Sequence, residues 1–69
     1  MKDRLIVRLK DRRQQLGLTQ SALADEVGVS RKTINTIENG VFVPSTVLAL
    51  LLASRLKCSV HDLFALRED

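Results

Sequence analysis

Apolar side chains near the start of the chain recur at helical spacing. Leu5, Ile6, Leu9 and Leu16, with Arg13 between them, lie three or four residues apart along one face. This spacing predicts an amphipathic helix over residues 3–15. Gly17 follows it, and glycine readily adopts the left-handed conformation that ends a helix.

Residues that start and stop helices recur along the rest of the chain. A hydroxyl residue that can cap a helix precedes each further apolar segment, and glycines 28 and 40 end two of these segments. Residues 41–44, Val-Phe-Val-Pro, are expected to form a loop, because the residue before proline avoids the α conformation. No segment shows a strand pattern. The sequence therefore predicts a single all-α domain over residues 1–69, a five-helix bundle whose later helices cover residues 20–27, 31–39, 46–56 and 60–65.

Size and composition limit the chemistry available to the chain. Its 69 residues include one cysteine, Cys58, and one histidine, His61, so neither an internal disulfide nor a Cys/His metal site is expected. Cys58 is expected to be a small core residue, and a lone cysteine fits a reducing cytoplasm. The longest apolar run, residues 47–53, is too short to cross a membrane. No cofactor or small-molecule ligand is indicated, and a partner chain is the plausible extra source of stability.

Charge is distributed unevenly along the chain. The net charge is +3, and residues 1–16 contain six Lys or Arg against two Asp. Residues 61–69 contain three carboxylates against one Arg. One end of the molecule could thus face phosphate groups, although charge alone fits a solvated helix surface equally well.

Residues 19–40 have the pattern of two short helices joined by a tight turn. The turn is Gly28-Val29-Ser30. Gly28 permits a positive φ, Val29 can fill the corner between the helices, and the small Ala24 allows their backbones to approach. Helices that cross steeply through a short glycine-containing turn are typical of the helix-turn-helix motif.

The second helix of this motif has the side chains that read DNA bases. Its inward positions are apolar, and its outward positions are Arg31, Lys32, Asn35 and Thr36. Arg and Lys can donate to guanine, Asn can pair with adenine, and the threonine methyl can contact thymine. Taken singly, each of these residues could equally be a solvated polar group.

These residues resemble those of the lambda-type repressor/Cro family, also called the xenobiotic-response-element family. The resemblance covers about residues 5–64, and its most specific parts are Leu18-Thr19-Gln20 and Ile37-Glu38-Asn39-Gly40. It implies a five-helix fold that binds operator DNA as a dimer and regulates transcription, with the recognition helix in the major groove. It places Arg31, Lys32, Asn35 and Thr36 against the bases. The residues it implies for phosphate contacts are Thr19, Gln20, Ser30, Asn39 and Arg12.

The family often places an ion pair at the positions of Arg13 and Glu38. A carboxylate near the C-terminal end of a helix is unfavourable on its own, because the helix dipole is negative there. A cation from the first helix would offset that cost, so the two residues are predicted to pair. The alternative is two unrelated surface charges.

The chain departs from the family in three places. The loop after the recognition helix is apolar, Val41-Phe42-Val43, where the family is often basic. Val47 and Leu51 replace residues that are usually charged. Lys57 stands where glycine commonly follows the fourth helix, so it must accept a strained turn or end the helix differently.

The apolar departures predict a homodimer. Val47 and Leu51 lie one turn apart on the fourth helix, which already uses Leu48, Leu52 and Leu56 for the core. Exposed together with Val41, Phe42 or Val43, they would form a patch of the kind that marks an interaction surface. A two-fold dimer would bind an inverted repeat. The competing surface is the C-terminal helix, where Leu63 or Leu66 could pair instead.

Three classes of function are open to a chain of this kind. The favoured one is a sequence-specific regulator, a repressor, that binds double-stranded DNA. The alternative is a protein-binding module, such as an antitoxin or adaptor that reuses the fold. An enzyme is not expected, because the sequence has no nucleophile elbow, phosphate-binding glycine loop or cluster of metal ligands.

Overall fold

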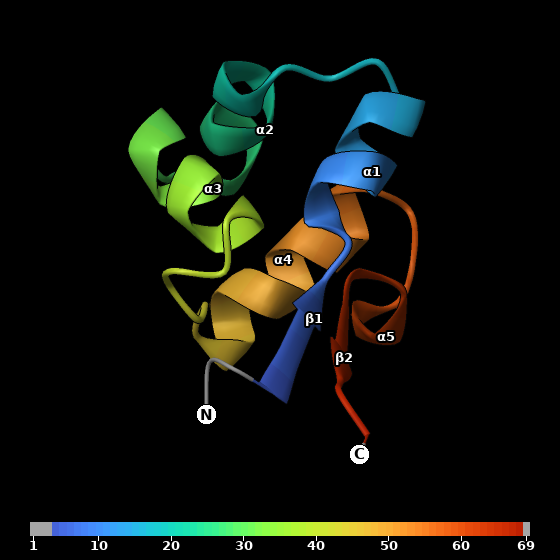
Figure 1. Cartoon of the computed structure of the whole chain (residues 1–69). Coiled ribbons are helices and arrows are strands. Elements are labelled where there is room, and N and C mark those ends of the chain that lie inside the picture. The colour runs from blue at the N-terminus through green and yellow to red at the C-terminus, as the bar shows by residue number, and fades with distance from the viewer. Residues whose placement is uncertain (1–3, 69) are drawn as a thin grey trace.

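The computed structural model describes residues 4–68 as five helices and a two-stranded sheet (Figure 1). The predicted helices at the centre of the chain are confirmed to within one residue at each end. The elements in order are β1 (Leu5–Val7), α1 (Leu9–Gln15), α2 (Gln20–Val27), α3 (Arg31–Glu38), α4 (Thr46–Arg55), α5 (Val60–Leu63) and β2 (Phe64–Leu66).

The strands correct the all-α prediction. The first half of the helix expected over residues 3–15 is β1, and the end of the helix expected over 60–65 is β2. Residue 3 lies outside the described part of the chain. The strands pair antiparallel, with Ile6 opposite Ala65, and lie side by side in Figure 1. Three residues are too few to distinguish a helical from a strand period, and the pairing partner is about 60 residues away in the sequence.

The core lies between the helices and one face of the small sheet. Its fully buried side chains come from every helix, and Leu5 and Val7 of β1 pack against them. Cys58 is half-buried and also packs against the core. The largest fully buried side chains are Leu9, Leu23, Ile34, Ile37, Leu52, Leu56 and Leu63. Because Leu63 is fully buried, its predicted alternative role in a dimer contact is wrong.

Side-chain caps begin the helices where the sequence predicts them. The hydroxyls of Thr19, Ser30 and Ser45 each accept a hydrogen bond from a backbone N–H three residues later. At α5, Ser59 and Asp62 form a capping box, and the backbone N–H and hydroxyl of Ser59 both donate to the Asp62 carboxylate. These two hydrogen bonds stabilise the carboxylate and lower the pKa of Asp62.

Lys57 accepts the strained turn after α4. Its φ is 58°, in the left-handed region that favours glycine. The turn closes through a hydrogen bond of 3.0 Å from the Cys58 N–H to the Ala53 carbonyl. Arg12 donates from Nε to the Leu56 carbonyl (3.0 Å) and from Nη2 to the Lys57 carbonyl (3.2 Å). A cation thus satisfies carbonyls at the C-terminal end of α4, where the helix dipole is negative.

Residues 4–68 contain neither a membrane-spanning helix nor a cluster of metal ligands. None of the helices there is long and apolar enough to cross a membrane. The same residues contain no group of three or more His, Cys, Asp or Glu side chains that could hold a metal ion.

Candidate nucleic-acid interface

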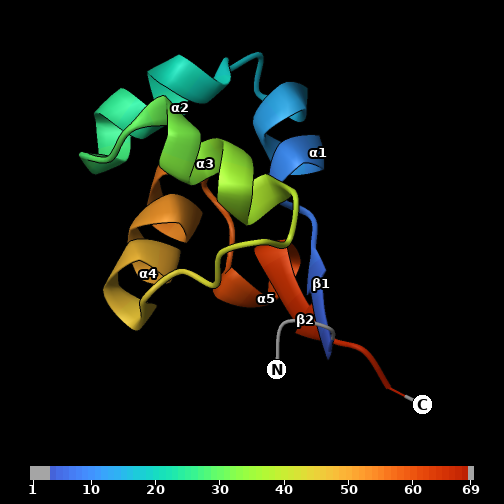
Figure 2. The same ribbon diagram turned by 60° about the vertical axis from the view of Figure 1, so that its left-hand side comes forward.

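Helices α2 and α3 form the helix-turn-helix pair predicted from the sequence. Gly28 ends α2 with a φ of 76°, and the Val29 N–H donates to the Ala24 carbonyl (3.0 Å). The Val29 side chain packs against the core and so fills the corner between the helices. The turn leaves α3 on the outside of the molecule, across α2 (Figure 2).

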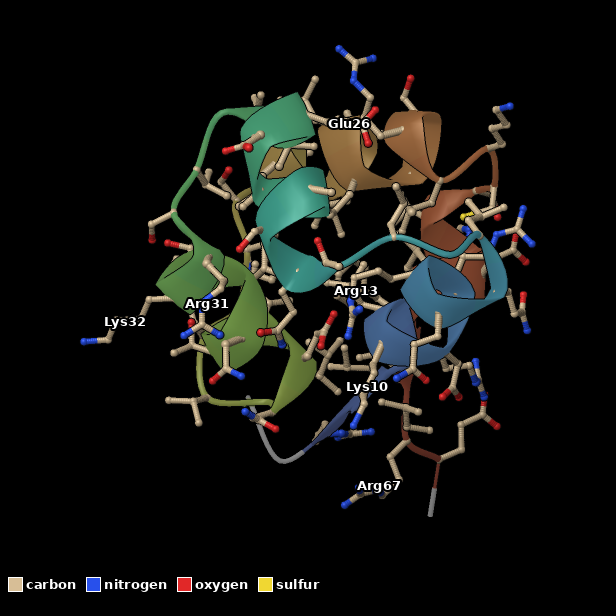
Figure 3. All side chains as sticks on the ribbon, turned by 90° about the horizontal axis from the view of Figure 1, so that it is seen from above. Lys10, Arg13, Glu26, Arg31, Lys32 and Arg67 are labelled. Carbon is tan, nitrogen blue, oxygen red and sulfur yellow. The ribbon has the colours of Figure 1, made fainter. Side chains whose placement is uncertain are left out.

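Helix α3 has one buried face and one exposed face. Ile34 and Ile37 are fully buried. On the other side of the helix, side chains four residues apart lie in line, and they form two rows that run along the helix. Arg31 and Lys32 are both exposed, and Figure 3 shows Lys32 pointing away from the body of the molecule. One row is Arg31, Asn35 and Asn39, and the other is Lys32 and Thr36.

A buried ion pair attaches α3 to α1. Arg13 donates to both carboxylate oxygens of Glu38, from Nε at 2.6 Å and from Nη2 at 3.1 Å. The side chains are only 8% and 2% exposed. Arg13 also donates from Nη1 to the Leu18 carbonyl at 2.8 Å, so the inward-pointing guanidinium in Figure 3 has a partner on each nitrogen. The predicted Arg13–Glu38 pair is therefore confirmed.

Gln20 connects this buried pair to the exposed face of α3. Its Nε2 donates to Glu38 Oε1 (2.9 Å), and its Oε1 accepts from Arg31 Nη1 (3.3 Å). The sequence suggested only a phosphate contact for Gln20. The structure adds a second role, because the amide holds Arg31 at the start of α3.

The other residues predicted to contact phosphates lie in different parts of the structure. The hydroxyls of Thr19 and Ser30 are at the N-termini of α2 and α3, where they act as caps. Asn39 lies exposed beside Asn35, and its Nδ2 donates to Asn35 Oδ1 (3.2 Å). Arg12 lies on α1, and its guanidinium donates hydrogen bonds to carbonyl groups at the C-terminal end of α4. The structure therefore gives Arg12 a structural role that the sequence did not suggest, and its predicted phosphate contact stays a prediction.

Two groups of exposed apolar side chains lie on α4 and in the loop after α3. On α4, Val47 is 67%, Leu50 57% and Leu51 36% exposed, and sequence reasoning missed Leu50. Beside Leu50 is an apolar groove of about 340 Å³ that Val43 also lines. Phe42 is not part of that groove. It lines a separate hollow with Lys32 and Thr36 of α3. Its predicted part in a dimer contact with Val47 and Leu51 stays a prediction, because neither of those residues lines the groove beside Leu50.

Comparison with known proteins agrees with this geometry. The model of the helix-turn-helix family HTH_3 matches residues 9–63, which span α1 to α5. This chain belongs to that family. A similar relative, an uncharacterized HTH-type transcriptional regulator of Methanothermobacter thermautotrophicus, is 44% identical over 62 residues, covering 88% of this chain and 90% of the relative.

Solved structures place this helix-turn-helix protein among those of the lambda repressor/Cro type. The restriction-modification controller protein C.AhdI from Aeromonas hydrophila has a TM-score of 0.75 and 33% identity, over 80% of this chain and 83% of that chain. The P22 c2 repressor, in complex with a synthetic operator, has a TM-score of 0.75 and 35% identity, over 78% and 82% of the two chains.

Proposed function

We propose that this helix-turn-helix protein is a sequence-specific, double-stranded DNA-binding repressor of transcription that acts in the cytoplasm. Helix α3 enters the major groove, and Arg31, Lys32, Asn35 and Thr36 contact base edges. Gln20, with Thr19 and Ser30 at the helix N-termini and Asn39 at the end of α3, contacts the phosphates on either side. Repression follows when the bound protein occludes a promoter.

The observation that supports this proposal most strongly is the pair of donor side chains, Arg31 and Lys32, on the outward side of a firmly anchored helix α3. Arg31 and Lys32 are exposed, and neither forms a salt bridge among the described residues. The buried Arg13–Glu38 pair holds the far end of the helix, and Gln20 holds Arg31. Donors held in place on a rigid helix can form bidentate contacts with guanine or adenine without losing much side-chain freedom. The P22 c2 repressor, which is 35% identical, was crystallised with an operator.

We further propose that the protein acts as a homodimer through α4. Val47, Leu50 and Leu51 expose large apolar side chains on one helix, beside the groove lined by Val43. A two-fold dimer of this kind would place its recognition helices about 34 Å apart, one DNA turn, and would select an inverted repeat.

Selection of bound sequences from a random double-stranded DNA library tests the proposal. We expect an inverted-repeat consensus, and binding to it that weakens steeply as salt is raised, because neutralised phosphates release their counterions. The alternative function is a protein-binding module such as an antitoxin or adaptor, which the exposed apolar face of α4 favours. Such a module would yield no consensus and no steep dependence of DNA binding on salt.

Substitution of Arg31 tests the assignment of the base-reading residues. Arg31→Ala should lose about 1–3 kcal/mol of binding free energy on the selected site and relax the preference at one position. Arg55→Ala is the matched control, because it removes the same charge from an exposed position on α4. An unchanged ratio of specific to random-DNA affinity in Arg31→Ala would contradict the assignment. Gln20→Ala should weaken binding to all sequences and, because Gln20 holds Arg31, also reduce part of the discrimination.

A further inference from the structure

Two exposed apolar side chains follow the recognition helix. Val41 is 59% and Phe42 46% exposed, in the loop where lambda-type relatives are often basic. Large apolar groups at the surface of a small domain commonly mark a contact surface. The question is which partner this particular surface fits.

The loop is fixed against the end of α3. Gly40 takes a φ of 74°, and the backbone N–H groups of Val41 and Phe42 both donate to the Thr36 carbonyl, at 2.9 and 3.2 Å. These hydrogen bonds hold the loop beside α3. The side chains of Val41 and Phe42, together with residues of α3, line one open hollow of about 350 Å³. The lining residues are Ser30, Lys32, Thr33, Thr36, Val41 and Phe42.

The hydroxyl groups in this hollow are already occupied within the protein. Ser30 Oγ lies 3.1 Å from the Thr33 backbone N–H that donates to it and 3.0 Å from Thr33 Oγ1. Thr36 Oγ1 donates to the Thr33 carbonyl at 2.9 Å. Thr36 thus has its hydroxyl proton committed to the helix, and its methyl group is the part suited to an outside contact. The hollow offers an apolar surface with one cation, Lys32, and no carboxylate in its lining.

That combination fits the major groove of DNA. The apolar group that DNA exposes there is the C5-methyl of thymine, and it lies between rows of phosphates that a neighbouring lysine would attract. The hollow is continuous with the Lys32–Thr36 row of α3. A second copy of the chain is a poorer fit here, because the exposed apolar side chains of α4, Val47, Leu50 and Leu51, offer it a separate surface without a cation.

We propose that Val41 and Phe42, with the Thr36 methyl, form a thymine-methyl contact that adds sequence preference outside the recognition helix itself. This inference rests on the proposed DNA binding. Each methyl removed from such a contact should weaken binding about fourfold, the value of one buried methyl or methylene group.

Deoxyuridine substitution tests the proposal, because it removes only the C5-methyl of thymine. The wild-type protein is first used to select its site, and each thymine is then replaced by deoxyuridine in turn. We expect one or two positions where the wild type loses about fourfold in affinity. Phe42→Ala and Val41→Ala should bind the thymine site more weakly and lose that sensitivity. Leu16→Ala is the control, because Leu16 is nearly as exposed as Phe42 but lines a different hollow at the end of α1.

The outcomes separate this inference from the proposed function. If the wild type selects no site, the proposed function fails. If it selects one but Phe42→Ala and Val41→Ala keep the full deoxyuridine effect, only the thymine contact is overturned. A Phe42→Ala variant that becomes monomeric in sedimentation would instead place the hollow in a dimer contact. Circular dichroism of each variant, with Phe42→Leu as a milder change, separates loss of the contact from loss of the fold.

Discussion

Glu38 illustrates how one residue connects stability to the proposed DNA-binding surface. Its carboxylate lies at the C-terminal end of α3, where the helix dipole is unfavourable, and it is almost fully buried. Arg13 and Gln20 supply three hydrogen bonds that compensate for this position. The arrangement is stable only while the set is complete, because either charge left alone would be buried without a partner.

A double-mutant cycle measures this dependence. Arg13→Met alone should lower the free energy of unfolding by about 3–5 kcal/mol, because it strands the Glu38 carboxylate. Arg13→Met combined with Glu38→Gln should lose less than the sum of the two single changes. The measurement is denaturant unfolding of the four proteins. Additive losses would mean that the pair does not contribute as a unit.

Lys57 has a strained backbone that a single substitution can relieve. A non-glycine residue in the left-handed region costs about 1–2 kcal/mol, and glycine returns part of that as extra entropy of the unfolded chain. Lys57→Gly should therefore raise the free energy of unfolding by about 0.5–1 kcal/mol, seen as a higher midpoint in thermal unfolding. Lys57→Ala keeps the strain and should show no gain. Equal stabilisation by both variants would contradict the backbone explanation.

Among the elements, the N-terminus of α3 combines two roles in one residue. The Ser30 hydroxyl accepts the Thr33 N–H and so caps the helix, while the positive end of the helix dipole lies at the same place. Our proposal also places Ser30 next to a phosphate. Helix capping and phosphate contact place different demands on the side chain at this position, so substitutions can separate the two roles.

Two substitutions of Ser30 separate capping from phosphate contact. Ser30→Ala should lower the free energy of unfolding by about 1 kcal/mol through loss of the cap. Ser30→Asp keeps a good cap, so stability should stay near the wild type, but its carboxylate should weaken DNA binding at least about tenfold by repelling phosphate. Arg55→Ala, which changes the net charge by the same amount on α4, should have a much smaller effect. Undiminished DNA binding by Ser30→Asp would remove Ser30 from the interface.

At the scale of the whole molecule, two exposed apolar surfaces lie on different parts of the domain. The Val41–Phe42 hollow faces the same side as the exposed rows of α3, whereas Val47, Leu50 and Leu51 lie on α4. This division fits a domain that binds DNA on one side and a second copy of itself on another. Leu66, 67% exposed at the end of β2, is the remaining competitor for the dimer contact.

Sedimentation decides which surface forms the dimer. The wild type should be dimeric at micromolar concentration. Val47→Glu combined with Leu51→Lys should be a folded monomer, because a dimer would have to remove the two charged side chains from water in an apolar contact. Leu66→Lys should remain dimeric. A monomeric wild type would contradict the dimer, and a double variant that stays dimeric would shift the contact to the β2 end.

The sequence by itself determined the helices and their ends in the middle of the chain. Capping by Thr19, Ser30 and Ser45 and helix termination at Gly28 depend on groups within one turn of the backbone, so local sequence is sufficient. The same holds for the buried face of α3, which a helical period reveals. The Arg13–Glu38 pair was predictable only through the resemblance to a known family.

Only the tertiary structure decided the features that depend on distant partners. Leu5–Val7 forms a strand because Phe64–Leu66 lies beside it, and three residues alone show no readable period. Arg12 caps α4 and Phe42 packs toward the exposed side of α3 because of where neighbouring elements end. In each case the deciding partner is brought near by folding, and its position depends on packing across the whole domain rather than on the local sequence.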